Sequence, residues 1–173
     1  MEEAGRSGIQ TATDEVPVDH GVLVPMAFVG PHVPDASLVI IALSGLSGAM
    51  HAKLGASIRK AADASGKRVA IIASGDLSHK LKETGTYGYV PESEVFDNAV
   101  TKALSTGRLD ALMTIDQTLV IKAAQCGLDS FKVLAGAFED TAFDHRLLSY
   151  EGPFGVGYAV AEFVRKDVNP DVT

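Results

Sequence analysis

The pattern of hydrophobic positions predicts two buried strands joined by a helix. Residues 38–43 and 68–73 are short, continuous runs of apolar and often β-branched residues, which is typical of strands covered on both faces of a sheet. Residues 49–65 lie between these runs and place apolar side chains on one helical face, with Gly66 as a helix-ending residue. This strand–helix–strand order predicts a right-handed parallel crossover.

The second half of the chain alternates helical patterns with glycine and ends in a predicted strand pair. Apolar spacing predicts helices over four ranges: 92–105, 108–115, 117–126 and 131–138. Residues 146–150 and 157–164 favour two strands, with a glycine-rich turn between them. The whole order predicts an α/β fold in three layers, in which a central, largely parallel sheet is covered by helices on both faces.

The chain is expected to form one domain with short flanking segments. Residues 1–18 have no apolar period and are rich in Gly, Thr and acidic residues, which favours a flexible lead-in. A chain of 173 residues has the length of a single domain, and we place that domain at residues 19–166. Residues 167–173 are then a tail.

Composition and charge exclude several classes of partner. Lys and Arg number 15 and Asp and Glu 22, so the formal net charge is −7, which argues against binding to nucleic acid or to an anionic membrane. No apolar run reaches the roughly 18 residues of a membrane span. The single cysteine cannot form an internal disulfide, which favours a reducing, cytoplasmic location.

The loop after the second predicted strand carries the first candidate for chemistry. His79 lies there beside Asp76 and Ser78, and functional loops of parallel sheets follow the carboxyl ends of strands. A neutral imidazole could accept a proton near neutral pH, with Asp76 fixing its tautomer. The alternative is a surface histidine beside an aspartate that caps a turn.

Three further residues are candidates with an equally plain structural alternative. His20 precedes the apolar, apparently extended stretch 22–25 and is either a ligand or an ordinary loop residue. Cys126, at the end of a predicted helix, is either a thiolate ligand or a small core residue. Tyr87 either lines a pocket for a phenol-like ligand or covers apolar surface. The other histidines are expected on the surface or in a turn: His51, His145 and His32.

Several segments together resemble one known family. They are residues 18–25 (VDHGVLVP), 73–79 (ASGDLSH), 124–128 (AQCGL) and 149–158 (SYEGPFGVGY). In order and spacing they resemble the B-subunit domain of class III extradiol ring-cleaving dioxygenases, and most closely its Memo-like branch, over residues 18–165. The resemblance also implies a parallel-containing sheet covered by helices.

The resemblance implies a metal site and a proton-transfer residue. In these dioxygenases two histidines and a glutamate hold a non-haem Fe(II). By resemblance His20 falls on the second metal histidine, Cys126 on the glutamate, and His79 on the histidine that takes the catechol proton. The first metal histidine of the family lies in an amino-terminal region, whereas only 19 residues precede His20 and none is histidine. We therefore expect an incomplete site in an amino-terminally shortened member of the family.

Two functions follow as expectations from the resemblance. The first is a non-haem, metal-dependent ring-cleaving oxidoreductase acting on a catechol-type aromatic. The alternative is a Memo-like metal-binding or partner-binding protein without dioxygenase activity, because a thiolate at Cys126 favours Zn or Cu over iron. The resemblance also implies an AMMECR-type domain or a radical-SAM protein as a partner. A third alternative is a non-catalytic remnant that keeps the sheet only for assembly with another chain, for example as a homo-oligomer, because a sheet edge exposed by truncation tends to be covered by another strand or subunit.

Overall fold

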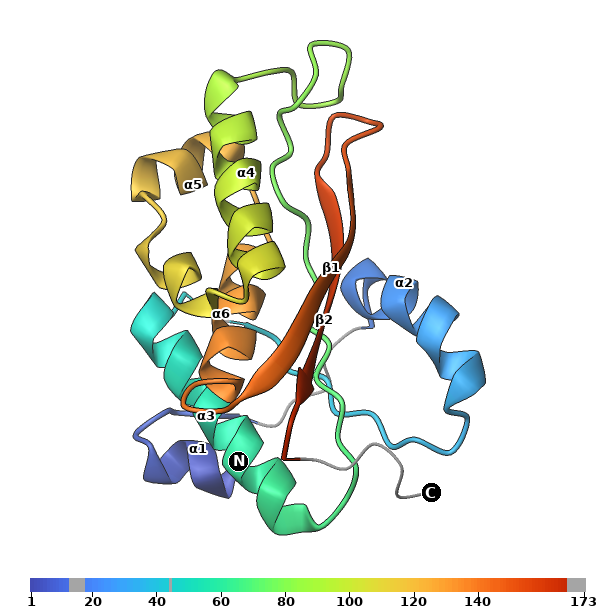
Figure 1. Cartoon of the computed structure of the whole chain (residues 1–173), viewed down its shortest axis with the longest axis vertical. Coiled ribbons are helices and arrows are strands. Elements are labelled where there is room, and N and C mark those ends of the chain that lie inside the picture. Colours follow the sequence, from blue (N-terminus) through green and yellow to red (C-terminus); the bar gives the residue numbers. More distant parts are fainter. Residues whose placement is uncertain (13–17, 44, 168–173) are drawn as a thin grey trace.

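The regular structure of the described residues consists of helices and one strand pair (Figure 1). The computed structural model describes residues 1–12, 18–43 and 45–167. The elements within these ranges are α1 (Glu2–Arg6), α2 (His20–Val29), the 3-10 helix η1 (Gly30–His32), α3 (Gly48–Ser65), α4 (Pro91–Thr106), the 3-10 helix η2 (Leu109–Thr114), α5 (Gln117–Ala123), α6 (Leu128–Ala137), β1 (Phe143–Glu151) and β2 (Tyr158–Arg165). The prediction of mixed helix and sheet is confirmed.

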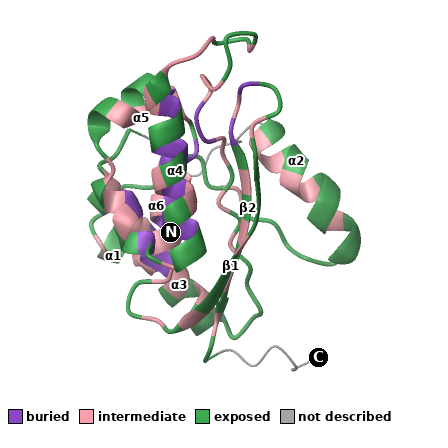
Figure 2. Cartoon of the chain, turned by 45° about the horizontal axis from the view of Figure 1, so that its top comes forward, coloured by how far each residue is buried: buried purple, intermediate pink, exposed green. Residues whose placement is uncertain are grey.

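The apolar core lies where α4 and α6 meet the inner side of the strand pair (Figure 2). The face of α4 that carries Phe96, Val100 and Leu104 is buried, because these residues recur every three or four positions and so share one side of the helix. Side chains of β1 and β2 pack against this cluster, among them Leu147 and Phe163. The core therefore joins the carboxyl-terminal two-thirds of the chain into one packed unit.

Helix α3 begins and ends close to where its pattern predicts. The hydroxyl of Ser47 accepts a hydrogen bond from the N–H of Met50 at the amino end, and Gly66 ends the helix in the left-handed conformation, with φ of 63°. α3 packs closely on α6, since a Cβ atom at Gly55 would lie 1.8 Å from the carbonyl oxygen of Val133. Glycine at this position is what allows the two helix backbones to approach.

The surface position expected for His51 is wrong. His51 lies one turn before Gly55, on the face of α3 that meets α6, and its side chain is fully buried. The nearest charge is the carboxylate of Asp129, whose oxygen lies 3.5 Å from Nδ1. The sequence pattern missed this because the buried face of α3 is made largely of small residues, which give a weak apolar signal.

The predicted strand pair is confirmed as an antiparallel ladder. Phe143 pairs with Arg165 at one end and Glu151 pairs with Tyr158 at the other, and the register shifts between Leu147 and Ser149. The turn between the strands carries Gly155 in the left-handed region, with φ of 86°. Within the described residues this ladder is the only named sheet.

The expected central, largely parallel sheet is not confirmed. Residues 38–43 and 68–73 are assigned no strand, and none of the backbone hydrogen bonds found among the described residues joins either segment to a neighbour. Their apolar side chains are largely exposed, with Val39 at 80%. A segment made of apolar residues can be buried, but it forms a strand only where a neighbouring strand completes its hydrogen bonds. The three-layer arrangement therefore lacks its middle layer here.

Helix α2 occupies the stretch that was expected to be extended. Residues 22–25 lie inside this helix, which continues through Pro25, and His20 is its first residue rather than part of a loop. None of its residues is buried, and its main contacts are with η1, which follows directly. The apolar side of α2 is therefore uncovered; its exposed large side chains are Leu23, Val24, Phe28 and Val29.

The amino-terminal lead-in contains some structure. Residues 2–6 form α1, which packs on α3, and Ala4 and Ile9 are buried. Residues 13–17 of the predicted lead-in and 168–173 of the predicted tail lie outside the described residues. No helix among the described residues is long and apolar enough to cross a membrane.

Candidate metal site

The loop from Asp76 to His79 is held by backbone hydrogen bonds on several sides. The carbonyl of Asp76 accepts from the N–H of Gly127 at 2.9 Å, and the N–H of His79 donates to the carbonyl of Ala123, also at 2.9 Å. The loop thus lies against the connection between α5 and α6, which carries Cys126. These contacts fix the loop backbone from which the two candidate side chains project.

Two glycines allow this loop to approach the α5–α6 connection. A Cβ atom at Gly75 would lie 2.4 Å from the Cα atom of Gly127, which is far inside van der Waals contact. A Cβ atom at Gly127 would lie 2.5 Å from Cζ of Phe131 and 2.8 Å from the carbonyl oxygen of Gly75. Glycine at both positions therefore lets Asp76 and Cys126 come together from distant parts of the chain.

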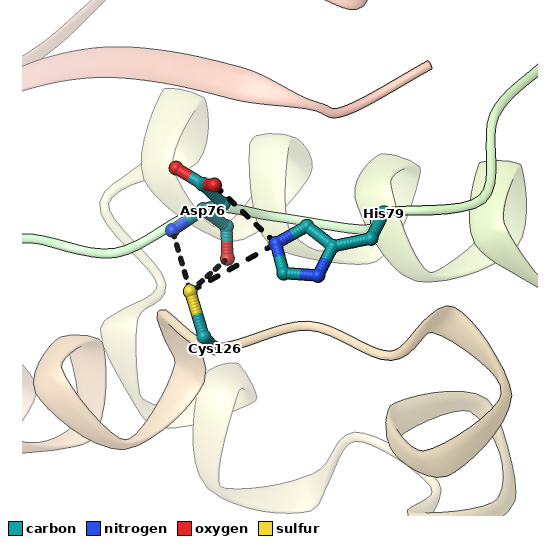
Figure 3. Close-up of side chains that lie close together, drawn as sticks. All are labelled: Asp76, His79 and Cys126. Atoms are coloured by element: carbon teal, nitrogen blue, oxygen red, sulfur yellow. Dashed lines mark hydrogen bonds and ion pairs between the residues drawn. The ribbon is translucent and has the colours of Figure 1, made fainter. Parts of the chain in front are cut away.

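Asp76, His79 and Cys126 converge on one point (Figure 3). The Nε2 atom of His79 lies 3.3 Å from Oδ2 of Asp76 and 3.9 Å from Sγ of Cys126. One ligand atom from each residue lies within 4.8 Å of the others. The N–H of Asp76 also donates to Sγ of Cys126 at 3.2 Å. Sulfur, nitrogen and oxygen donors therefore face a common space.

The thiol of Cys126 is held in its protonated form when no cation is near. Partial burial raises its pKa, and the negative charge of Asp76 raises it further, against the opposing effect of the hydrogen bond from the Asp76 N–H. The cysteine side is nevertheless open to solvent. A cation could therefore reach the sulfur, and it would have to displace a proton in order to bind there.

The other predicted site residues fall in two different places. Tyr87 stacks on His79, with ring centroids 5.3 Å apart and an angle of 27° between the planes, and more than half of its side chain is exposed. His20 does not belong to the donor cluster found among the described residues. The amino end of α2 lies nearby, because a Cβ atom at Gly21 would lie 3.9 Å from the hydroxyl of Ser74.

The sequence analysis missed a buried carboxylate beneath the loop and the tyrosine that is bonded to it. Asp97 of α4 is 1% exposed, and its carboxylate accepts from the N–H of Ser78 and from the hydroxyl of Tyr150. Burial raises the pKa of Asp97, and burial with the hydrogen bond to that carboxylate raises the pKa of Tyr150 well above its ordinary range. The sequence did contain a signal for this buried carboxylate, because Asp97 follows Phe96 directly and lies on the apolar face of α4.

The chemistry of the donors and two of their three separations fit a tetrahedral ion, and the sulfur–oxygen separation is at most 4.8 Å. Ligands about 2.3 Å (sulfur) and 2.0–2.2 Å (nitrogen, oxygen) from a tetrahedral Zn²⁺ lie roughly 3.4–3.6 Å from one another. The observed 3.9 Å between sulfur and nitrogen and 3.3 Å between nitrogen and oxygen are close to these values. The two-histidine, one-carboxylate set of non-haem iron enzymes is not matched, because the cluster holds one imidazole and one thiol.

The Cys–His–Asp cluster, which lies between the loop at 76–79 and the α5–α6 connection, places the chain among candidate metal-binding proteins. Comparison with known families narrows that class: residues 1–161 match the family described as the catalytic LigB subunit of aromatic ring-opening dioxygenase. The chain belongs to this LigB family. The predicted resemblance to class III extradiol dioxygenases is thereby confirmed at the level of the family.

A relative from a clostridium adds to the family match. The chain is 39% identical over 143 residues to a protein of Clostridium acetobutylicum named Protein CA_C1420. The matching region covers 83% of this chain and 31% of the relative. The chain thus spans about a third of the length of that relative, whose printed name gives no activity.

Proposed function

We propose that this chain binds one divalent metal ion through Cys126, His79 and Asp76, as a metal-dependent protein of the LigB family. The supporting observation is the convergence of three different donor atoms at separations close to those around tetrahedral zinc. The three side chains come from the loop after residue 75 and from the α5–α6 connection, 47 to 50 residues apart in the chain. Three protein ligands leave a fourth position open, as in catalytic rather than purely structural zinc sites.

The bound ion would supply Lewis-acid chemistry at that open position. The Nε2 atom of His79 faces the carboxylate of Asp76, so both donors are directed to the same side of the loop. Because the cluster contains a thiol, it favours Zn or Cu over oxygen-activating iron. The donor set thus supports a metal-binding member of the family, as in the second of the two functions expected from the sequence.

Metal titration of the purified chain tests this proposal. After removal of metal with a chelator, Co²⁺ is added as a spectroscopic substitute for zinc, and the metal content is measured by mass spectrometry. We expect one ion per chain, with a sulfur-to-metal charge-transfer band that is absent in Cys126→Ser. The affinity should fall more than about 100-fold in His79→Ala, since even the loss of a residue behind the ligands costs 10–100-fold. His32→Ala removes an exposed histidine of η1 and is the matched control.

Two results of this titration would contradict the proposal. A chain that binds no ion, or that binds equally well in Cys126→Ser, His79→Ala and His32→Ala, would remove the proposal.

Ring cleavage of a catechol-type aromatic is the second candidate function. The family match and the pairing of His79 with Asp76 favour it, because a histidine held by a carboxylate is suited to take the proton of a phenolic hydroxyl. Tyr87, stacked on His79, would offer an aromatic surface beside that histidine. In this function the Nε2 atom of His79 exchanges a proton instead of binding the ion, so the two candidates assign it different roles.

A catechol assay distinguishes the candidates. The chain is loaded with Fe(II) without oxygen, mixed with a panel of catechols, and then exposed to air. A yellow ring-opened product that is lost in His79→Ala, while the metal content stays unchanged, would support ring cleavage. Absence of product with every catechol would leave metal binding as the function.

Among the predicted partners, a second copy of this chain has support in the surface. The chain exposes 11008 Å², whereas a compact monomer of 18.1 kDa exposes roughly 8,100 Å². The excess per chain is more than the roughly 800 Å² that each partner buries in an interface of standard size.

The uncovered apolar segments suit a copy of the same acidic chain. Residues 20–29 and 38–43 contain no Asp, Glu, Lys or Arg, so two chains of net charge −7 could meet there without burying like charges. Sedimentation should show a dimer that dissociates in Phe28→Asp and persists in Ile121→Asp, a control on exposed α5. A monomeric wild-type chain would contradict this. An AMMECR-type domain, a radical-SAM protein and an aromatic substrate stay predictions.

A further inference from the structure

Asp97 is a buried carboxylate that lies beneath the metal-site loop. It belongs to α4, yet its two oxygens are bonded to other parts of the chain. Oδ1 accepts from the N–H of Ser78 at 2.8 Å, and Oδ2 accepts from the hydroxyl of Tyr150 in β1 at 2.7 Å. Among the salt bridges of the described residues none involves Asp97. The carboxylate is therefore satisfied by hydrogen bonds alone.

A buried carboxylate at this place needs a reason. Removing a charged group from water is costly, and burial already raises the pKa of this group. An apolar side chain on the same face of α4 would fill the space without that cost. What an apolar residue could not do is accept the N–H of Ser78, the residue directly before His79. The buried carboxylate of Asp97 therefore lowers the stability of the fold, but it also fixes the backbone of the loop through the N–H of Ser78.

The carbonyl side of Ser78 is held as firmly as its N–H. Gly157, just before β2, donates its N–H to the carbonyl of Ser78 at 2.8 Å and accepts the N–H of Leu77 at 2.9 Å. Gly157 also makes room for the carboxylate, because a Cβ atom there would lie 2.1 Å from Oδ2 of Asp97. Together with the bond from His79 to Ala123, these contacts leave the backbone at 77–79 little freedom.

We propose that Asp97 is a positioning residue of the metal site, which acts through Ser78 to hold His79 opposite Cys126. This inference rests on the proposed metal-binding function, and it adds to that function the residue that sets the geometry of the donors. Asp97 touches neither the donors nor the open position; it fixes the peptide unit from which the imidazole projects. Groups behind metal ligands commonly act in this way, by orienting the ligand.

Two variants remove this control differently. Asp97→Asn keeps the size of the side chain, but the amide has only one oxygen to accept the two hydrogen bonds from Ser78 and Tyr150. Gly157→Ala leaves Asp97 in the sequence and forces its carboxylate away from the loop. Leu112→Ala, a truncation of a fully buried residue in η2, is the control for a general loss of stability.

The test consists of one measurement with bound metal and one without metal. With Co²⁺, Asp97→Asn and Gly157→Ala should bind 10- to 100-fold more weakly, with shifted ligand-field bands that report a changed geometry. Leu112→Ala should lower the melting temperature and leave the bands of the bound ion unchanged. Without metal, the amide of Ser78 should exchange with solvent about tenfold faster in Asp97→Asn, because its acceptor is no longer charged.

These readings separate the two proposals. If the wild-type chain binds no Co²⁺, the proposed function fails, and the exchange of the Ser78 amide and the separation of His79 from Cys126 by NMR still decide the role of Asp97. Wild-type exchange and an unchanged His79–Cys126 contact in Asp97→Asn would overturn the positioning role. If Asp97→Asn does not fold, wild-type affinity and bands in Gly157→Ala would overturn it equally.

Discussion

The Nε2 atom of His79 lies 3.9 Å from the Sγ atom of Cys126, although 47 residues separate them in the chain. All of α4, η2 and α5 lie between them in sequence. The contact exists because the loop at 76–79 runs against the α5–α6 connection and is bonded to it at both Gly127 and Ala123. The site is thus a product of tertiary structure, and its tests concern the donors and the contacts that bring them together.

Cys126 and His20 should differ sharply as metal ligands. Cys126→Ser removes the sulfur from the cluster, and we expect the affinity for Zn²⁺ to fall more than about 100-fold. His20→Ala should leave the affinity within about twofold of wild type, because His20 lies outside the donor cluster in an exposed first turn of α2. Calorimetric titration of both variants measures this. A large loss in His20→Ala would show that α2 moves onto the site when metal binds.

Gly75 should be intolerant of even one added methyl group. In Gly75→Ala the new Cβ would lie 2.4 Å from Cα of Gly127, so the loop must move away from the α5–α6 connection. We expect a loss of about 1–3 kcal/mol of stability, as in overpacked cores, together with weaker metal binding. Thermal unfolding and Co²⁺ titration measure the two effects. Gly5→Ala, where nothing lies within 4 Å of the new atom, is the control and should lower neither the stability nor the affinity for metal.

The helices from α3 to α6 could be predicted from the sequence because their signals are local, whereas α1 and α2 were not predicted. α3 was expected at 49–65 and is found at Gly48–Ser65, since its apolar period and its terminal glycine lie within the segment itself. The pair of strands β1 and β2 was also predicted, because a short turn brings adjacent segments together. In each of these cases the residues that decide the structure are near neighbours in the chain.

The parallel sheet and the position of His20 could not be predicted in the same way. An apolar run such as 38–43 shows that a segment can be buried, but its pairing depends on a partner elsewhere in the structure. The stretch 22–25 was expected to be extended, yet α2 contains it and continues through Pro25. Asp76, His79 and Cys126 were each proposed from motifs, but only Cys126 as a metal ligand; His79 and Asp76 were proposed as catalytic residues. Asp97 was missed because its role depends on a contact with Ser78.

Tyr87 should support the imidazole through its ring and not through its hydroxyl. The ring of Tyr87 stacks on the imidazole of His79. Aromatic contacts of this kind contribute about 0.5–1.5 kcal/mol. Tyr87→Phe keeps the ring, so the affinity for metal should stay close to wild type. Tyr87→Ala should weaken binding roughly two- to tenfold. Phe28→Ala removes an exposed aromatic ring on α2 and is the control in the same titration. Equal affinities in Tyr87→Phe and Tyr87→Ala would show that the stacking has no effect on the site.

The affinity for metal should rise with pH further into the alkaline range than an ordinary cysteine site would allow. Zn²⁺ binds the thiolate, so each ion displaces the thiol proton of Cys126 as long as the pH lies below the pKa of that thiol. Burial and the charge of Asp76 raise this pKa, so the rise, up to about tenfold per pH unit, should continue past the pH at which a free cysteine is ionised. Alkylation of the metal-free chain by iodoacetamide measures the same pKa directly, with a cysteine-containing peptide as the control. In Asp76→Asn the negative charge is gone, and the alkylation midpoint should move toward that of the peptide. A wild-type midpoint at or below that of the peptide would contradict the environment described for Cys126.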